Sequence, residues 1–151
     1  MVISFCGHAS FSASETVEKC LLDFLNEEIG QEPVFFYLGG YGAFDEFAYS
    51  VCKKYREEHA NARLAFITPY ITEDYQKKVL SLEKERYDEI IYPEIENKPL
   101  RFAISYRNQW MMEKADVVIA FVEHDWGGAY KSYRYAKRKG KKIFNLASTN
   151  L

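Results

Sequence analysis

Apolar and polar residues follow two different periods along this chain. Short, nearly continuous apolar runs alternate with longer stretches in which apolar side chains recur every three to four residues. The first pattern is typical of buried strands and the second of amphipathic helices. The runs predict strands over residues 2–6, 34–38, 63–67, 88–92, 116–121 and 142–146. The periodic stretches predict helices over residues 12–30, 44–58, 72–84, 100–114 and 129–139.

Regular alternation of strands and helices predicts a parallel sheet with helices on both faces. The run DVVIAF, at 116–121, is too apolar to face water on either side and indicates a central strand. A length of 151 residues suits one hydrophobic core. We therefore predict a three-layer, Rossmann-like α/β fold, with residues 1–151 forming a single domain.

Glycine and polar residues are concentrated in the loops that follow the predicted strands, at 7–10, 39–42, 68–70 and 123–128. In open parallel sheets, ligands bind beyond the carboxyl ends of the strands, where the strand order reverses. The fold rule therefore brings these four loops together and predicts a site for a nucleotide-like or sugar-phosphate ligand.

The stretch VFFYLGGYGAFDEFAYSVCKKY, at 34–55, is read as a strand, a tight glycine turn and a helix. Gly39, Gly40 and Gly42 permit positive φ and close approach of a ligand to the backbone. The helix that follows directs unpaired N–H groups toward an anion such as phosphate. Gly127 and Gly128 repeat this arrangement before the last helix. A glycine turn without a ligand is the alternative.

The loop after the first strand offers a second set of candidates. Gly7 would allow close approach and Ser10 could donate to a phosphate, while His8 could act as an acid or base. The alternative is a structural loop with a helix-capping serine, and Ser12 with Glu15 has the spacing of a capping box.

Charged residues complete the candidate site. Asp45 and Glu46 lie in the first turn after the glycines, where carboxylates suit the helix dipole but could also bind ribose hydroxyls or act at an anomeric carbon. Glu123 is a further candidate catalytic carboxylate. Arg107 lies on a largely apolar helix face, so its guanidinium needs a phosphate or an acidic side chain as a partner.

The segment from Glu123 to Trp126 contains metal-ligand residue types, but no Cys or His pair has metal-binding spacing. We therefore expect no metal site and no cofactor. Trp126 either stacks on a base or packs in the core.

The net charge of −2 argues against a basic groove, so we expect neither a nucleic acid nor a membrane as a partner. The basic run KRKGKK, at 137–142, is interpreted as the end of a helix. Three widely spaced cysteines, no apolar run of membrane-spanning length and no signal-peptide pattern predict a reduced, cytoplasmic protein. The 12 tyrosines would suit either a core or a homo-oligomer interface.

The motifs in this order resemble the SLOG superfamily of Rossmann-like proteins, which unites DNA processing protein A with the LOG ("Lonely guy") phosphoribohydrolases. FCGHAS, at 5–10, is similar to the first strand and its loop. YLGGYGAFDEFA, at 37–48, is similar to the glycine motif Ser-Gly-Gly-Ala-x-Gly-Ile-Asp, which places Gly39, Gly40, Gly42 and Asp45 at motif positions. The resemblance implies nucleotide binding.

The second half of the chain carries the rest of the resemblance. Arg107 and Met111 match the Arg and Met of the LOG Arg-Lys-x-x-Met helix, and ADVVIAF with WGG matches the late strand and second glycine turn. LOG enzymes have Pro-Gly-Gly-x-Gly-Thr-x-x-Glu at that turn. Here Tyr130 and Lys131 replace the third Gly and the Thr, and Arg134 replaces the catalytic Glu. Arginine cannot serve as that base, so the resemblance implies a ligand-binding domain that has lost the LOG catalytic route.

We therefore predict a sensor or binding domain for a nucleoside phosphate or an ADP-ribose-like ligand. The alternative is an enzyme acting at an N-glycosidic bond, such as a nucleotide phosphoribohydrolase or a nucleoside deoxyribosyltransferase, with Glu46, Asp45 or Glu123 as its carboxylate. Single-stranded DNA binding is a third hypothesis, which the net charge disfavours.

Overall fold

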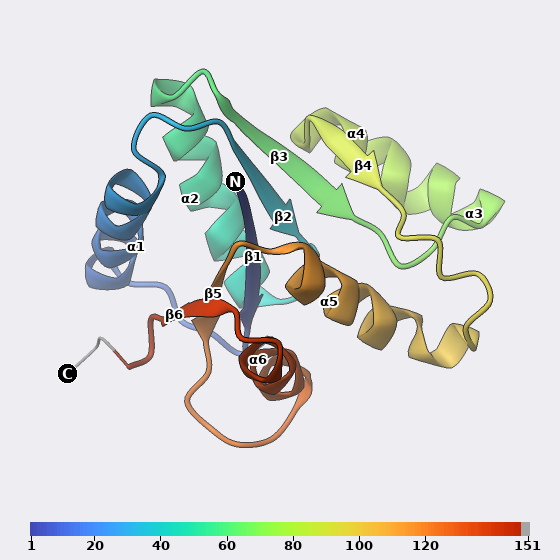
Figure 1. Ribbon diagram of the computed structural model, residues 1–151. Helices are drawn as coiled ribbons and strands as arrows, with labels where there is room; N and C mark the ends of the chain where they lie inside the picture. The colour runs from blue at the N-terminus through green and yellow to red at the C-terminus, as the bar shows by residue number, and fades with distance from the viewer. Residues whose placement is uncertain (149–151) are drawn as a thin grey trace.

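The computed structural model, described over residues 1–148, contains one six-stranded parallel sheet between two layers of helices (Figure 1). The strands are β1 (Val2–Gly7), β2 (Val34–Leu38), β3 (Ala62–Ile67), β4 (Glu89–Ile91), β5 (Val117–Phe121) and β6 (Lys142–Asn145). The longer helices are α1 (Glu15–Ile29), α2 (Ala43–Glu58), α5 (Ala103–Lys114) and α6 (Gly128–Arg138). The shorter helical segments are α3 (Glu73–Tyr75), the π-helix η1 (Gln76–Leu80), α4 (Ser81–Arg86) and the 3-10 helix η2 (Leu100–Phe102).

The strand order is β4-β3-β2-β1-β5-β6, and every neighbouring pair is parallel. The chain moves outward from β1 to β4 on one side, then crosses through α5 to β5 on the other side of β1. The order therefore reverses between β1 and β5, which is where a doubly wound sheet opens a crevice at its carboxyl edge. The three-layer Rossmann-like fold predicted from the sequence is confirmed.

The two faces of the sheet bury different side chains because successive residues of a strand point in opposite directions. Ile3 and Phe5 of β1 belong to the core beneath α1 and α2, whereas Cys6 belongs to the core beneath α5 and α6. Ser4 lies on the second face without exposure to water, and its hydroxyl donates to the Met111 carbonyl at 2.7 Å. Burial on both faces explains why the central strands lack the polar alternation of a solvated sheet.

Three predicted helices differ from the structure, and the smallest difference is at 100–114, where the first three residues form the 3-10 helix η2 and not part of α5. The first helix is capped by Ser14, whose hydroxyl accepts from the Val17 N–H, so the capping box of Ser12 and Glu15 was wrong. The helix that begins after Thr72 is not a single α-helix, because the π-helical segment η1 separates α3 from α4. Within the described residues, no helix combines the length and apolar character needed to cross a membrane.

Candidate ligand-binding cleft

A cleft of about 350 Å³ lies at the carboxyl edge of the sheet, beside the point where the strand order reverses. Residues from β1 and its loop, the end of β2, the N-terminal half of α2, helix α5 and the start of α6 form its walls. Its volume is within the range of small-molecule sites. Eight residues predicted from the sequence line it: Gly7, His8, Ser10, Gly39, Asp45, Arg107, Gly127 and Gly128.

Gly40 and Gly42 do not line the cleft, and the structure gives them roles in packing. Both have positive φ, at 66° and 89°. A Cβ on Gly42 would lie 2.8 Å from the Ala9 Cα, and one on Gly40 would lie 2.5 Å from the Phe66 ring. The Ala43 N–H donates to the Ala9 carbonyl at 3.0 Å. The loop after β1 therefore covers part of the α2 N-terminus that the sequence had suggested for phosphate.

The N-terminus of α6 is open to the cleft instead. Gly127 precedes the helix with a φ of 90°, and no side chain caps the helix there. A Cβ on Gly127 or Gly128 would meet nothing within 4 Å, so neither glycine is required by packing against a neighbour. Exposed N–H groups and the positive end of the helix dipole at this point favour an anion.

Arg107 reaches the cleft from α5 and is only 3% exposed. One terminal nitrogen donates to the Ile67 carbonyl at 2.6 Å and the Gly39 carbonyl at 3.1 Å, and Nε donates to the Asn108 side chain at 2.9 Å. Among the described residues, no carboxylate lies within 4.0 Å of its guanidinium nitrogens. The hydrogen-bond partners of this guanidinium are thus neutral, and the charge of Asp45 acts on it only from beyond 4.0 Å.

Asp45 is the one acidic residue among those that line the cleft within residues 1–148. Its Oδ2 accepts from the Tyr41 N–H at 2.9 Å. Burial raises the pKa of Asp45 to about 6, although the Tyr41 hydrogen bond and the nearby Arg107 charge act in the opposite direction. The carboxyl group can therefore gain or lose a proton near neutral pH, as an acid–base group requires.

The cysteine in the cleft is unsuited to nucleophilic chemistry. Cys6 is buried, and burial with the nearby Asp45 charge raises its pKa to about 12. Because the thiolate is the reactive form, this thiol is inert at neutral pH. It contributes an apolar surface to the cleft wall.

His8 is fixed by the chain that follows β5. Its Nε2 accepts from the Glu123 N–H at 3.0 Å, so the ring proton lies on Nδ1. Burial lowers the pKa of His8, and the neighbouring His124 lowers it further to a smaller extent. The charge of Glu123 acts in the opposite direction and raises it. The His8 ring stacks on His124 at 3.7 Å, and His124 stacks on Trp126 at 3.8 Å. Trp126 is 67% exposed and is not a core residue.

The other two candidate carboxylates lie away from the cleft lining. Glu46 is exposed and pairs with Arg86, with 2.9 Å between Nη2 and Oε2. Glu123 is exposed, and its contribution to the site is the backbone N–H that binds His8. Arg134, at the position of the LOG catalytic Glu, is also outside the lining. The residues 1–148 contain no cluster of three potential metal ligands.

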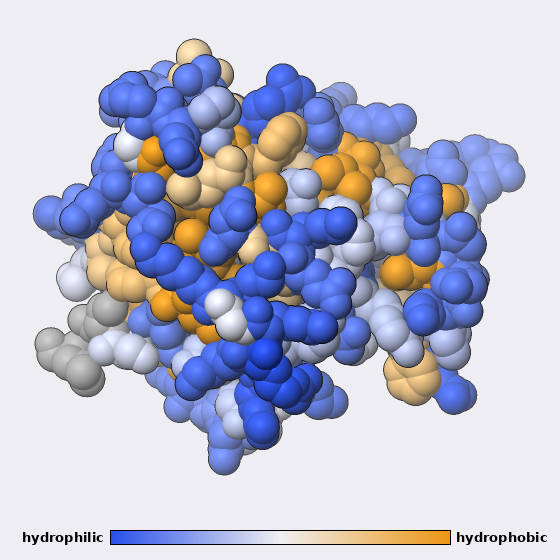
Figure 2. All heavy atoms as spheres, in the orientation of Figure 1, coloured by the Kyte–Doolittle hydropathy of each residue, from blue (hydrophilic) through white to orange (hydrophobic). Residues whose placement is uncertain are grey.

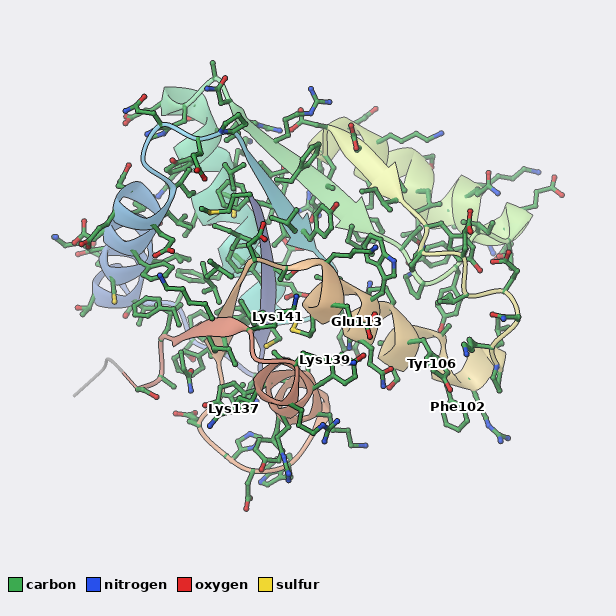
Figure 3. All side chains as sticks on the ribbon, in the orientation of Figure 1. Phe102, Tyr106, Glu113, Lys137, Lys139 and Lys141 are labelled. Carbon is green, nitrogen blue, oxygen red and sulfur yellow. The ribbon has the colours of Figure 1, made fainter. Side chains whose placement is uncertain are left out.

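Sequence reasoning interpreted the basic run at 137–142 as a helix end and did not connect it with Lys131 and Arg134 of the same helix. Residues 128–142 include seven Lys or Arg and no Asp or Glu, and the surface over α6 is strongly hydrophilic in Figure 2. Near the end of α6, Lys139 and Lys141 lie beside Glu113 of α5 (Figure 3). The four exposed cations of α6 itself, Lys131, Arg134, Lys137 and Arg138, have no carboxylate of the described residues within 4.0 Å.

Comparison with known proteins shows similarity in fold without close similarity in sequence. No protein-family model and no curated protein sequence matches the chain. DNA processing protein A from Helicobacter pylori, whose structure is described for its single-stranded DNA binding mode, is 18% identical with a TM-score of 0.61. The alignment covers 96% of this chain and 64% of that one.

Two further structures show the same fold. DNA processing protein A from Streptococcus pneumoniae is 15% identical with a TM-score of 0.63, and the alignment covers 95% of this chain and 49% of that one. The structural genomics target TM1055 is 14% identical with a TM-score of 0.55, over 94% of this chain and 71% of that one. The chain thus spans between about half and two thirds of the two DNA processing proteins.

These comparisons correct one expectation. The net charge led us to expect no nucleic-acid partner, yet a protein with this fold is described for its single-stranded DNA binding mode. The expectation was wrong because a net charge averages over the whole chain, while residues 128–142 carry seven Lys or Arg and no Asp or Glu. The fold that the resemblance implied is confirmed, because two DNA processing protein A structures share it.

Proposed function

We propose that the cleft binds a nucleoside phosphate or an ADP-ribose-like ligand, with the protein acting as a sensor or binding domain. The observation that carries the proposal is the buried guanidinium of Arg107, which lines the cleft with no carboxylate partner in the described chain. A buried cation is costly unless it is paired, and a phosphate would pair it.

The N-terminus of α6 supplies the second half of the anion site. The backbone N–H groups of Gly128, Ala129 and Tyr130 precede the first helical hydrogen bond, which the Lys131 N–H donates to the Gly127 carbonyl, so they are available to phosphate oxygens. The buried Ser132 hydroxyl also lines the cleft. Asp45 would repel a phosphate when it is ionised, so it suits the sugar hydroxyls. This division of roles matches the composition of a nucleotide, which has an anionic end and a neutral, hydroxyl-bearing sugar.

Gly128→Asp tests the anion site without disturbing the fold. Gly128 has no positive φ, and a Cβ at this position would meet no atom within 4 Å. An acidic residue in the first turn of a helix is also stabilising. The variant should therefore be as stable as the parent. It should nevertheless lose affinity for phosphate ligands, because the carboxylate occupies the anion position.

Gly128→Asn is the matched control, since it adds the same bulk without charge. Thermal shift would be measured with nucleosides, nucleoside mono-, di- and triphosphates, cyclic nucleotides, NAD and ADP-ribose. Ligand at about 100 times its dissociation constant should stabilise the parent by roughly 2.7 kcal/mol. The proposal would be refuted by an unchanged melting temperature across the panel, or by equal ligand responses of the Asp and Asn variants.

Product analysis of each stabilising ligand separates a binding domain from an N-glycosidic enzyme. An intact ligand after prolonged incubation would indicate binding or sensing. Release of free base would indicate an enzyme, and Asp45 would then be the carboxylate to test, because Glu46 and Glu123 lie outside the cleft lining. Asp45→Asn should abolish such release, whereas Glu46→Gln should retain it.

Single-stranded DNA binding is a second candidate function, favoured by the exposed cations of α6. Lys131, Arg134 and Arg138 are spaced three and four residues apart, so they share one side of the helix. Arg134 lies over the Tyr130 ring at 5.8 Å, which places an aromatic ring among the charges. A row of cations with interspersed aromatic rings can track a phosphate backbone and stack on bases.

A labelled oligothymidylate in an anisotropy titration would test this function. Each phosphate neutralised contributes about −0.7 to the slope of log K against log salt, so the four exposed cations predict a slope near −3. Replacing Lys131 and Arg134 with alanine should reduce the slope magnitude by about 1.4. Replacing Lys77 and Lys78, which are already ion-paired, is the control. A flat titration at low salt would exclude the function.

A further inference from the structure

Three aromatic rings form a continuous stack beside the cleft. His8 stacks on His124 with ring centroids 3.7 Å apart and planes inclined by 10°, and His124 stacks on Trp126 at 3.8 Å and 17°. All three residues line the cleft. The stack begins at a buried ring and ends at an exposed one, because His8 is 8% exposed and Trp126 is 67% exposed.

The stack holds Trp126 in place before any ligand arrives. The Glu123 N–H donates to His8 Nε2 at 3.0 Å, which ties the loop after β5 to the loop after β1. His124 Nδ1 lies 3.1 Å from the Trp126 carbonyl oxygen, so the His124 side chain also contacts the backbone of Trp126. A side chain held in its bound conformation loses less entropy on binding, so these contacts favour affinity.

One face of the Trp126 indole remains available. His124 covers the opposite face, and within residues 1–148 no other ring stacks on Trp126. Trp126 directly precedes Gly127 and Gly128, the glycines at the open N-terminus of α6. A ligand whose phosphate binds at those glycines therefore has an aromatic surface within the same loop.

We propose that Trp126 is a stacking platform for the nucleobase of a ligand bound in the cleft, and that the ligand class is a purine nucleotide. This inference rests on the proposed function, because the phosphate contact brings the base to the platform. A purine matches the two fused rings of indole in area, so it buries more apolar surface on Trp126 than a pyrimidine does.

Calorimetric titration with AMP, UMP and ribose 5-phosphate tests the platform. AMP should bind more tightly than UMP, and both more tightly than ribose 5-phosphate, which lacks a base. Base stacking on an aromatic side chain changes affinity by roughly 5- to 150-fold, so Trp126→Ala should weaken AMP binding by a factor in that range. The same variant should leave ribose 5-phosphate binding unchanged, and Trp126→Tyr should restore most of the AMP affinity.

Fluorescence distinguishes base stacking on Trp126 from a purely structural role of this residue. The chain has two tryptophans, and Trp110 lies outside the cleft lining, where it stacks on Tyr37. In a Trp110→Phe background, Trp126 is the single tryptophan, so emission excited selectively from indole reports this residue. AMP should quench its fluorescence with the dissociation constant found by calorimetry, whereas ribose 5-phosphate should bind without comparable quenching.

The outcomes separate the platform from the proposed function. Equal affinities for AMP and ribose 5-phosphate, or equal weakening of both by Trp126→Ala, would overturn the platform and leave the anion site standing. AMP binding that Trp126→Ala does not weaken would also overturn it. Failure of AMP, UMP and ribose 5-phosphate all to bind would overturn the proposed function, and the platform with it.

Discussion

Asp45→Asn is expected to stabilise the protein at neutral pH. Burial raises the pKa of this carboxyl from its ordinary value of 3.8 to about 6. When folding raises the pKa of an acid, its charged form lowers the free energy of unfolding. This loss of stability is fully present at pH values above the folded-state pKa. At about pH 7, the difference between the two pKa values corresponds to roughly 3 kcal/mol. This figure is an upper limit, since Asp45 keeps partial contact with water.

Asparagine removes the charge and keeps an oxygen that can accept the Tyr41 N–H, which Asp45 binds at 2.9 Å. Urea denaturation of parent and variant at about pH 7 and about pH 4 would measure the effect. The advantage of the variant should shrink to less than about 1 kcal/mol at the lower pH, because the parent then carries a proton on Asp45 in the folded state.

Glu46→Gln is the control for removing a neighbouring carboxylate. Glu46 is exposed and ion-paired with Arg86, so its loss should reduce the free energy of unfolding by between about 0 and 1 kcal/mol at neutral pH. The reasoning about Asp45 is refuted if Asp45→Asn is less stable than the parent at about pH 7. It is also refuted if the difference in free energy is the same at both pH values.

Three further substitutions test the packing of Gly7, the titration of His8 and the N-cap of α1. Gly7→Ala should destabilise the protein by about 1–3 kcal/mol in chemical denaturation, because a Cβ would lie 2.2 Å from the Phe44 ring; an unchanged midpoint would contradict the packing. Since the pKa of His8 is lowered in the folded state, the parent should lose stability as pH falls below about 6.5, where the unfolded chain takes up a proton. His8→Asn should lose less over the same interval, and equal losses would exclude His8 as the source. Ser14→Ala should lower the free energy of unfolding by about 1 kcal/mol, because it removes the side-chain cap of α1. An unchanged free energy of unfolding would show that Ser14 does not stabilise the start of this helix.

The fold could be predicted because its determinants are local. The run at 34–38 became β2 with the expected bounds, and the apolar positions of α2 from Phe44 to Tyr55 became its buried face. The cap of α1 could not be assigned in the same way, because Ser12 and Ser14 are both suitable residues. The packing of Phe11 and Val17 in the core fixes the register and places Ser14 at the helix start.

The candidate site was predictable only in its general location. A rule about parallel sheets identified the loops, but the role of each residue depends on contacts distant in sequence. Gly42 is needed because Ala9 approaches it. Arg107 donates to the carbonyl of Gly39, just after β2, and to that of Ile67, the last residue of β3. His8 accepts from an N–H 115 residues further along the chain. The spacing of apolar and polar residues along the sequence does not predict contacts between residues so far apart.

The uneven distribution of charge gives the protein an electric dipole moment. We expect its positive pole along α6, since Lys131, Arg134, Lys137 and Arg138 have no carboxylate of the described residues within 4.0 Å while the whole chain has a net charge of −2. Fields from such an arrangement exert torque on an approaching charged molecule and extend over about one Debye length, roughly 10 Å in dilute salt. A polyanion would consequently be rotated toward α6 during diffusion. The rate of productive encounter, rather than the lifetime of the complex, would therefore depend most strongly on ionic strength.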